Sequence, residues 1–263
     1  MHKEIQRHLE MMANYVRYRY GCLSTPTDLE KLAQGLGVKE IRQDDMSAWG
    51  CVENGEHGLV IRLRKDSPHT RMRFSLAHEI GHVMLELLEK KPNSQHYRHF
   101  RSYAQVASGA DEESMADQLA AYLLLPTDYM MRAISGDWSL ARLSTIARQA
   151  GVSLSASMIR SVDLFGYPIV AFHARRLQGE PWKLKWSRTN QPHAAEDIKS
   201  TLEDSSTLGA ICSPNFKGDR GAFTWTSIQT EVRRYHTVQN LYGLARITAA
   251  SAHSRTSNNA TWN

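Results

Sequence analysis

The sequence has few cysteines and lacks a long apolar run. Its three cysteines, Cys22, Cys51 and Cys212, are far apart and form no CxxC pair, which excludes a disulfide framework and a cysteine-based zinc site. No run of about 18 apolar residues is present that could span a bilayer. The first residues are charged where a signal peptide would need an apolar core. We therefore expect a cytoplasmic protein with no membrane partner.

The overall composition allows an ordinary globular fold. A chain of 263 residues with 41% hydrophobic content can bury the core of one large domain or of two smaller ones. The formal net charge of +5 would suit a nucleic acid or an acidic partner, but charge of this size is also common in proteins that bind neither. The motifs must therefore indicate the function.

The stretch Phe74–Leu85, FSLAHEIGHVML, contains the HExxH pattern. His78 and His82 are four residues apart, so on a helix they share a face and can reach one metal ion. Glu79 projects beside them, where it could take a proton from a water at the metal, as in zinc peptidases. Two histidines at this spacing can also be purely structural, and the pattern alone leaves both interpretations open.

The surroundings of the motif favour a buried amphipathic helix, because apolar residues recur at helical spacing on both sides of it. Gly81 lies inside this helix, where glycine costs roughly 1 kcal/mol of helix propensity. A glycine at this position is explicable if another backbone or the wall of the metal site packs closely against it.

A catalytic zinc site needs a third protein ligand, and the segment EESMADQLAAYLLLP offers Glu113. Glu113 and Asp117 share a helical face, so one can bind the metal while the other accepts the ring N–H of a ligand histidine. An ordinary acidic first turn, favoured by the helix dipole, is the alternative and suits Asp111 and Glu112. We favour Glu113 over Glu112, because only Glu113 keeps the metal, the supporting carboxylate and the apolar stripe in register.

The two segments together resemble the ImmA/IrrE family of zinc metallopeptidases, whose pattern is close to rFtlAHELGHxxL followed by ExxANxFAAxLLMP. The resemblance extends from about residue 20 to residue 165 and implies a gluzincin-like active site. It implies that His78, His82 and Glu113 are the zinc ligands and that Glu79 is the catalytic base. Asp117 stands where the family has asparagine or aspartate. The family also implies a protein substrate, an XRE-type helix-turn-helix repressor that is cut to release stress-response or mobile-element genes.

The fold class that we predict is α+β, with a zincin-like core at residues 1–126 made of a small mixed sheet and the HExxH helix. Strands are expected at 38–41, 48–52 and 58–64. The strand at 58–64 is either the sheet edge that pairs with an extended substrate or a plain sheet strand. A short helix after residue 27 is expected to be capped by Thr27, with Glu30 three residues later.

Residues 127–165 resemble a helix-turn-helix, with a glycine turn at Gly151 and a second helix opening at Ser153 or Ser155. The first turn of that helix lacks the Arg, Asn or Gln that usually reads bases. Packing or partner recognition is therefore preferred over DNA binding.

The remaining segments carry less information. Residues 166–250 contain strand-like runs that open with a hairpin, and we predict a C-terminal α+β accessory region that is sensor-like by resemblance to the family. The tail at 251–263 is expected to be disordered. A polar loop between the two metal helices is expected to contain a short helix at 103–107, and its His96 and His99 are not favoured as extra ligands.

The preferred function is thus a zinc-dependent endopeptidase. The main alternative is a DNA-binding transcriptional regulator whose zinc site is structural or vestigial. An intact Glu79 and an open site with three ligands count against that alternative, since structural zinc usually has four ligands and is rich in cysteine. A third hypothesis is a toxin or interaction protein that uses the peptidase fold as a scaffold.

Overall fold

The computed structural model describes residues 3–90, 109–136, 138–166, 168–177, 180–211, 219–220, 223–232 and 238–247. His96, His99, the expected helix at 103–107 and the tail at 251–263 lie outside these ranges. The chain divides into two compact units, one formed by residues 1–132 and 146–156 and the other by residues 133–145 and 157–263. Among the described helices, none has the length and apolarity needed to cross a bilayer.

The first unit begins with two helices, which are followed by a three-stranded mixed sheet. These elements are α1 (Lys3–Arg19), α2 (Leu29–Gly35), β1 (Val38–Asp44), β2 (Gly50–Gly55) and β3 (Gly58–Arg64). The strand order is β1-β3-β2, with β3 parallel to β1 and antiparallel to β2. The predicted strands are confirmed, but β3 is the central strand. Its interpretation as a substrate-binding edge is therefore wrong, because both of its sides are already paired, and β2 is an edge of the sheet.

The residue that caps the N-terminus of α2 also differs from the prediction. The side chain of Asp28, not that of Thr27, accepts a hydrogen bond from the backbone N–H of Lys31 at 3.0 Å. The buried hydroxyl of Thr27 donates instead to the carbonyl oxygen of Leu123, at 2.7 Å. This hydrogen bond fixes the start of α2 against the end of α5 (Gly109–Leu124).

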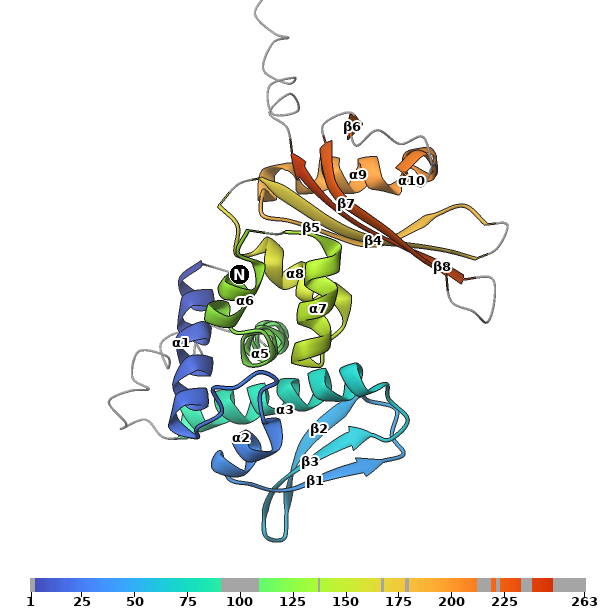
Figure 1. Ribbon diagram of the computed structural model, residues 1–263. Helices are drawn as coiled ribbons and strands as arrows, with labels where there is room; N and C mark the ends of the chain where they lie inside the picture. Colours follow the sequence, from blue (N-terminus) through green and yellow to red (C-terminus); the bar gives the residue numbers. More distant parts are fainter. Residues whose placement is uncertain are drawn as a thin grey trace, which may run out of the picture. The chain divides into compact units, whose positions relative to one another are not determined.

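The centre of the first unit is the packing of α3 (His69–Lys90) between the small sheet and α5, while α1 covers another side of α5 (Figure 1). Both central helices contribute fully buried side chains, as does the middle strand. Examples are Ile80 of α3, Leu119 of α5 and Ile61 of β3, each 0% exposed. The apolar stripes predicted from the sequence thus form one core, which fixes how α3 and α5 cross.

Three further helices follow, namely α6 (Thr127–Ile134), α7 (Leu140–Ala150) and α8 (Leu154–Val162). Gly151 has a φ of +67°, which a residue with a side chain rarely adopts, so it makes the turn after α7. The hydroxyl of Ser153 accepts from the backbone N–H of Ala156 at 3.1 Å and so caps α8. The predicted sequence of helix, glycine turn and helix is therefore confirmed.

The second unit contains a five-stranded antiparallel sheet with the order β5-β4-β8-β7-β6. Its elements are β4 (Ile169–Leu177), β5 (Lys183–Thr189), the 3-10 helix η1 (Pro192–Ala194), α9 (Ala195–Glu203), α10 (Ser205–Ile211), β6 (Asp219–Arg220), β7 (Phe223–Val232) and β8 (Val238–Ile247). The predicted hairpin is confirmed as β4 and β5. The mixed α+β class is confirmed as well.

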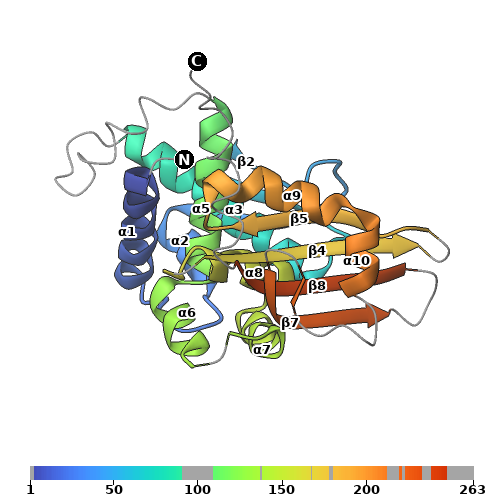
Figure 2. The same cartoon turned by 90° about the horizontal axis from the view of Figure 1, so that it is seen from above.

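Helices α9 and α10 cover one face of this sheet (Figures 1 and 2). Ile198 and Leu208 from the helices share a buried cluster with Phe172 and Leu241 from the strands. Phe172 lies directly against Gly243, because a Cβ atom built at Gly243 would lie 2.1 Å from its ring. A glycine is therefore needed at this point of β8.

Candidate metal centre

The backbones of α3 and α5 approach most tightly at Gly81. A Cβ atom at this position would lie 3.0 Å from the carbonyl oxygen of Ala116 and 3.1 Å from its Cα atom. Distances this short are rare for real Cβ atoms, so the glycine allows the two helices to pack more closely than an alanine would. The expectation that another backbone packs against this glycine is confirmed. Because His82 follows Gly81 and Glu113 lies one turn before Ala116, the close approach brings the candidate ligands together.

Three side chains bring their ligand atoms into a small triangle at this crossing. The Nε2 atoms of His78 and His82 are 3.1 Å apart. The Nε2 atom of His78 lies 3.2 Å from Oε2 of Glu113, and that of His82 lies 3.4 Å from Oε1 of the same carboxylate. A tetrahedral zinc ion with bonds of about 2.0 to 2.1 Å separates its ligand atoms by about 3.3 Å. The donor set and its spacing therefore fit a metal ion.

Two more carboxylates of α5 hold the other nitrogens of the histidine rings. The Nδ1 atom of His78 lies 2.8 Å from Asp117, and the Nδ1 atom of His82 lies 3.1 Å from Glu112. A ring that donates its Nδ1–H to a carboxylate keeps Nε2 as a lone-pair donor, in a fixed orientation. The hydrogen bond to Asp117 also raises the pKa of His78, although burial of the ring opposes this.

Sequence reasoning placed Asp117 in this supporting role but assigned Glu112 only to an acidic first turn. The structure places Glu112 beside His82. The sequence held a signal for this contact of Glu112. Each candidate ligand histidine needs a carboxylate that accepts its ring N–H, and Asp117 could serve only one of the two. The side chain of Glu113 is 66% exposed, while those of His78 and His82 are 17% and 21% exposed. The centre therefore opens to solvent on the side of the carboxylates.

Glu79 is buried beside the triangle, with 6% of its surface exposed. The pKa of its carboxyl group is raised, because burial outweighs the opposing effect of the neighbouring His78 and His82. Its position depends on Gly50 at the start of β2, since a Cβ atom there would lie 2.5 Å from the Oε1 atom of Glu79. The need for Gly50 was not visible in the sequence, because residues 50 and 79 meet only when β2 packs on α3.

Comparison with known proteins identified a family and solved structures of similar fold. Residues 33–161 match the model of the M78 peptidases, described as an IrrE N-terminal-like domain. The solved structure of a Mycobacterium tuberculosis transcriptional regulator is similar, with a TM-score of 0.54 and 14% sequence identity over 93% of this chain and 80% of that chain. At this identity the similarity concerns the fold alone. No curated protein matches the chain.

Proposed function

Because residues 33–161 belong to the M78 peptidase family of IrrE N-terminal-like domains, which are metallopeptidase-type enzymes, we propose that this chain is a zinc-dependent endopeptidase. The observation that carries the proposal is the triangle of ligand atoms from His78, His82 and Glu113, with Glu79 next to it. Two imidazoles and one carboxylate are a ligand set of catalytic zinc, which keeps a fourth position open. The exposure of Glu113 supports such an opening.

Each residue then has a distinct part in the reaction. Zinc held by His78, His82 and Glu113 would polarise a peptide carbonyl and make a nearby water more acidic. Glu79 takes a proton from the attacking water and returns it to the leaving amine. A carboxylate whose pKa is raised by burial is suited to this exchange, because it binds and releases a proton more readily near neutral pH. Asp117 keeps the ring of His78 directed at the metal.

The substrate that we propose is a protein, an XRE-type helix-turn-helix repressor in the cytoplasm, as the ImmA/IrrE resemblance implies. An extended segment of it can pair with β2, because β2 is an edge of its sheet and its first residue contacts Glu79. Cleavage would release stress-response or mobile-element genes. In this proposal residues 1–126 are the zincin-like core, residues 127–165 a helix-turn-helix-like segment, and residues 166–250 an accessory region that regulates the peptidase.

The second candidate function is a DNA-binding regulator. The observation in its favour is that α7, Gly151 and α8 form a helix, a turn and a second helix. Against it, the first residues of α8 are Leu154, Ser155 and Ala156, which offer little for reading base edges. A role of this segment in packing or in recognising a protein partner is therefore preferred.

The test is to co-express the protein with the XRE-type repressor encoded nearest to it and to look for a cleavage fragment. Wild-type protein should produce one discrete fragment, and Glu79→Gln should produce none while retaining bound zinc by elemental analysis. Comparing cleavage and bound zinc between the wild type and Glu79→Gln separates loss of the catalytic base from loss of the metal. Absence of a fragment with both proteins, together with specific operator binding by the wild type, would favour the DNA-binding alternative.

A further inference from the structure

The face of α3 that carries the metal ligands continues toward the start of the helix with an aromatic and a basic residue. Arg71, Phe74 and His78 lie at positions i, i+3 and i+7 and so share one helical face. The guanidinium carbon of Arg71 lies 5.7 Å from the centre of the Phe74 ring. The Phe74 ring lies 6.3 Å from that of His78. The three side chains form a continuous row that ends at the metal centre.

Trp49 extends this row onto the small sheet. It directly precedes Gly50, which contacts Glu79, and its carbonyl oxygen accepts a hydrogen bond from the backbone N–H of Arg64 at 3.1 Å. The guanidinium carbons of Arg64 and Arg71 lie 5.0 Å and 4.4 Å from its ring centre. Trp49 nevertheless remains 45% exposed. We call Arg64, Trp49, Arg71 and Phe74 the arginine–tryptophan strip.

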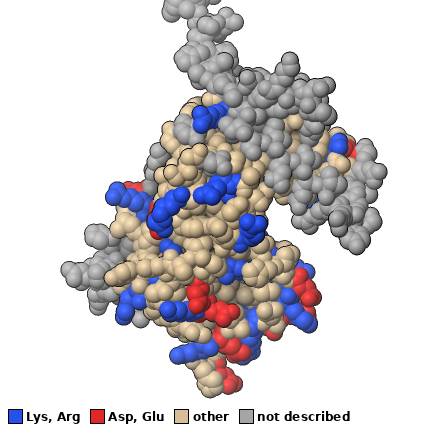
Figure 3. All heavy atoms as spheres, in the orientation of Figure 1, with Lys and Arg blue, Asp and Glu red and all other residues tan. Residues whose placement is uncertain are grey.

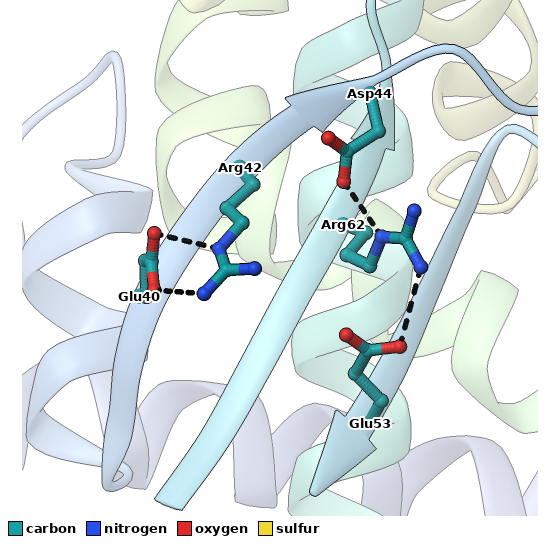
Figure 4. A network of polar contacts seen from close by, with 5 residues as sticks. All are labelled: Glu40, Arg42, Asp44, Glu53 and Arg62. Atoms are coloured by element: carbon teal, nitrogen blue, oxygen red, sulfur yellow. Dashed lines mark hydrogen bonds and ion pairs between the residues drawn. The ribbon is translucent and has the colours of Figure 1, made fainter. Parts of the chain in front are cut away.

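Arg64 of β3 and Arg71 of α3 differ from Arg42 and Arg62 of the sheet, because neither has an acidic partner among the described residues. Arg42 is paired with Glu40, and Arg62 with Asp44 and Glu53 (Figure 4). Charges of both signs are accordingly interspersed over this part of the surface (Figure 3). No carboxylate among the described residues lies within 4.0 Å of the guanidinium of Arg64 or Arg71. Within the described part of the chain, two positive charges near the metal centre thus have no internal counter-charge.

The position of a guanidinium over an aromatic ring indicates what it can bind. A guanidinium over an aromatic ring uses its flat face for that contact, and its N–H groups point outward in the plane. Those N–H groups match the two oxygens of a carboxylate. The exposed indole adds an apolar surface for the methylene groups of the same side chain. The strip therefore has the features needed to hold an aspartate or glutamate.

We propose that the arginine–tryptophan strip is a specificity subsite that binds an acidic side chain of the peptide substrate, an inference that rests on the proposed peptidase function. Arg71 lies seven residues before His78, which is about 10 Å along the helix axis. An extended peptide covers this distance in about three residues. The acidic residue of the substrate therefore lies about three residues from the cleaved bond and on one side of it only.

The first experiment measures cleavage specificity without a known substrate. Zinc-loaded wild-type protein is incubated with a proteome-derived peptide library, and the fragments are sequenced by mass spectrometry. Aspartate and glutamate should be enriched two to four residues from the cut on one side. The enrichment should disappear in Arg64→Gln/Arg71→Gln. Arg42→Gln/Arg62→Gln is the matched control, because it also removes two arginine charges but leaves the strip intact, and it should retain the enrichment.

The second experiment measures binding in the absence of cleavage. Two capped hexapeptides that differ only by Glu or Gln at one position are titrated calorimetrically into the full-length Glu79→Gln protein. The glutamate peptide should bind about tenfold more tightly, and this difference should shrink in high salt. The difference should also be absent after the double arginine substitution. Thermal unfolding of that variant shows whether it is folded, and Arg64→Gln alone serves as the milder variant if it is not.

The outcomes separate the two proposals. Cleavage without an acidic preference in the library overturns the subsite and leaves the peptidase standing. Selective binding of the glutamate peptide without any cleavage by the wild type overturns the peptidase and leaves the strip as a site for acidic peptides. Equal binding of the two peptides together with no cleavage overturns both.

Discussion

The substitution Gly81→Ala tests whether the close crossing of α3 and α5 builds the metal centre. In an open helix this change stabilises, because alanine has the better helix propensity by about 1 kcal/mol. At position 81 the added methyl group would lie 3.0 to 3.1 Å from backbone atoms of Ala116. A backbone cannot rotate away as a side chain can, so α5 must shift by a few tenths of an ångström.

The magnitude follows from these opposing effects. Overpacking of this kind typically costs about 1 to 3 kcal/mol. With about 1 kcal/mol regained from propensity, the free energy of unfolding should fall by about 1 kcal/mol. The effect on the metal should be clearer. Glu113 lies one turn from Ala116, and a shift of a few tenths of an ångström exceeds the tolerance of about 0.2 Å in metal–ligand distances. Zinc affinity should fall about tenfold or more.

The assay combines urea unfolding of the metal-free protein with zinc competition against a chromophoric chelator. Gly209→Ala in α10 is the matched control, because a Cβ atom there would meet no heavy atom within 4 Å. It should raise the free energy of unfolding by about 0.5 to 1 kcal/mol and leave zinc affinity unchanged. If Gly81→Ala stabilises the protein as much as the control does and binds zinc like the wild type, the close crossing is not the reason for the glycine.

Three further substitutions have definite expected outcomes. Gly50→Ala places a methyl group 2.5 Å from the carboxylate of Glu79. Repressor cleavage should therefore fall about 100-fold, while elemental analysis should still find bound zinc. Unchanged cleavage would mean that Glu79 tolerates displacement. Asp117→Asn weakens the hydrogen bond that orients its histidine, and zinc affinity by chelator competition should fall about 10- to 100-fold; equal affinity would exclude the orienting role. Gly243→Ala drives a methyl group into the Phe172 ring and should destabilise the second unit by about 1 to 3 kcal/mol. Hydrogen exchange in β4 and β8 measures this loss. Unaltered protection of these amides from exchange would contradict this packing.

Features that depend on one element could be predicted from the sequence. The spacing of four residues between His78 and His82 places both rings on one face of any helix, whatever packs against it. The same rule put Glu113 and Asp117 on one face of α5. Apolar periodicity was enough to predict the helix that carries HExxH and the strands of the first sheet, and the glycine at position 151 was enough to predict a turn, because these signals act within a few residues.

Features that depend on two elements meeting could not be predicted in this way. The sequence did not show that β3 lies between β1 and β2, because parallel pairing of β1 with β3 joins segments separated along the chain. It also favoured Thr27 as the cap of α2, since the competing partner of that hydroxyl, the carbonyl oxygen of Leu123, is 96 residues away.

The sequence by itself determined which side chains could serve as metal ligands and on which helical faces they stand. Only the tertiary structure decided that Glu112 lies against His82, that Gly50 makes room for Glu79, and that two arginines gather around the exposed Trp49. The physical reason is that local spacing fixes directions within one helix or strand. Distances between elements are set by how closely their backbones pack, and that depends on contacts from the whole core.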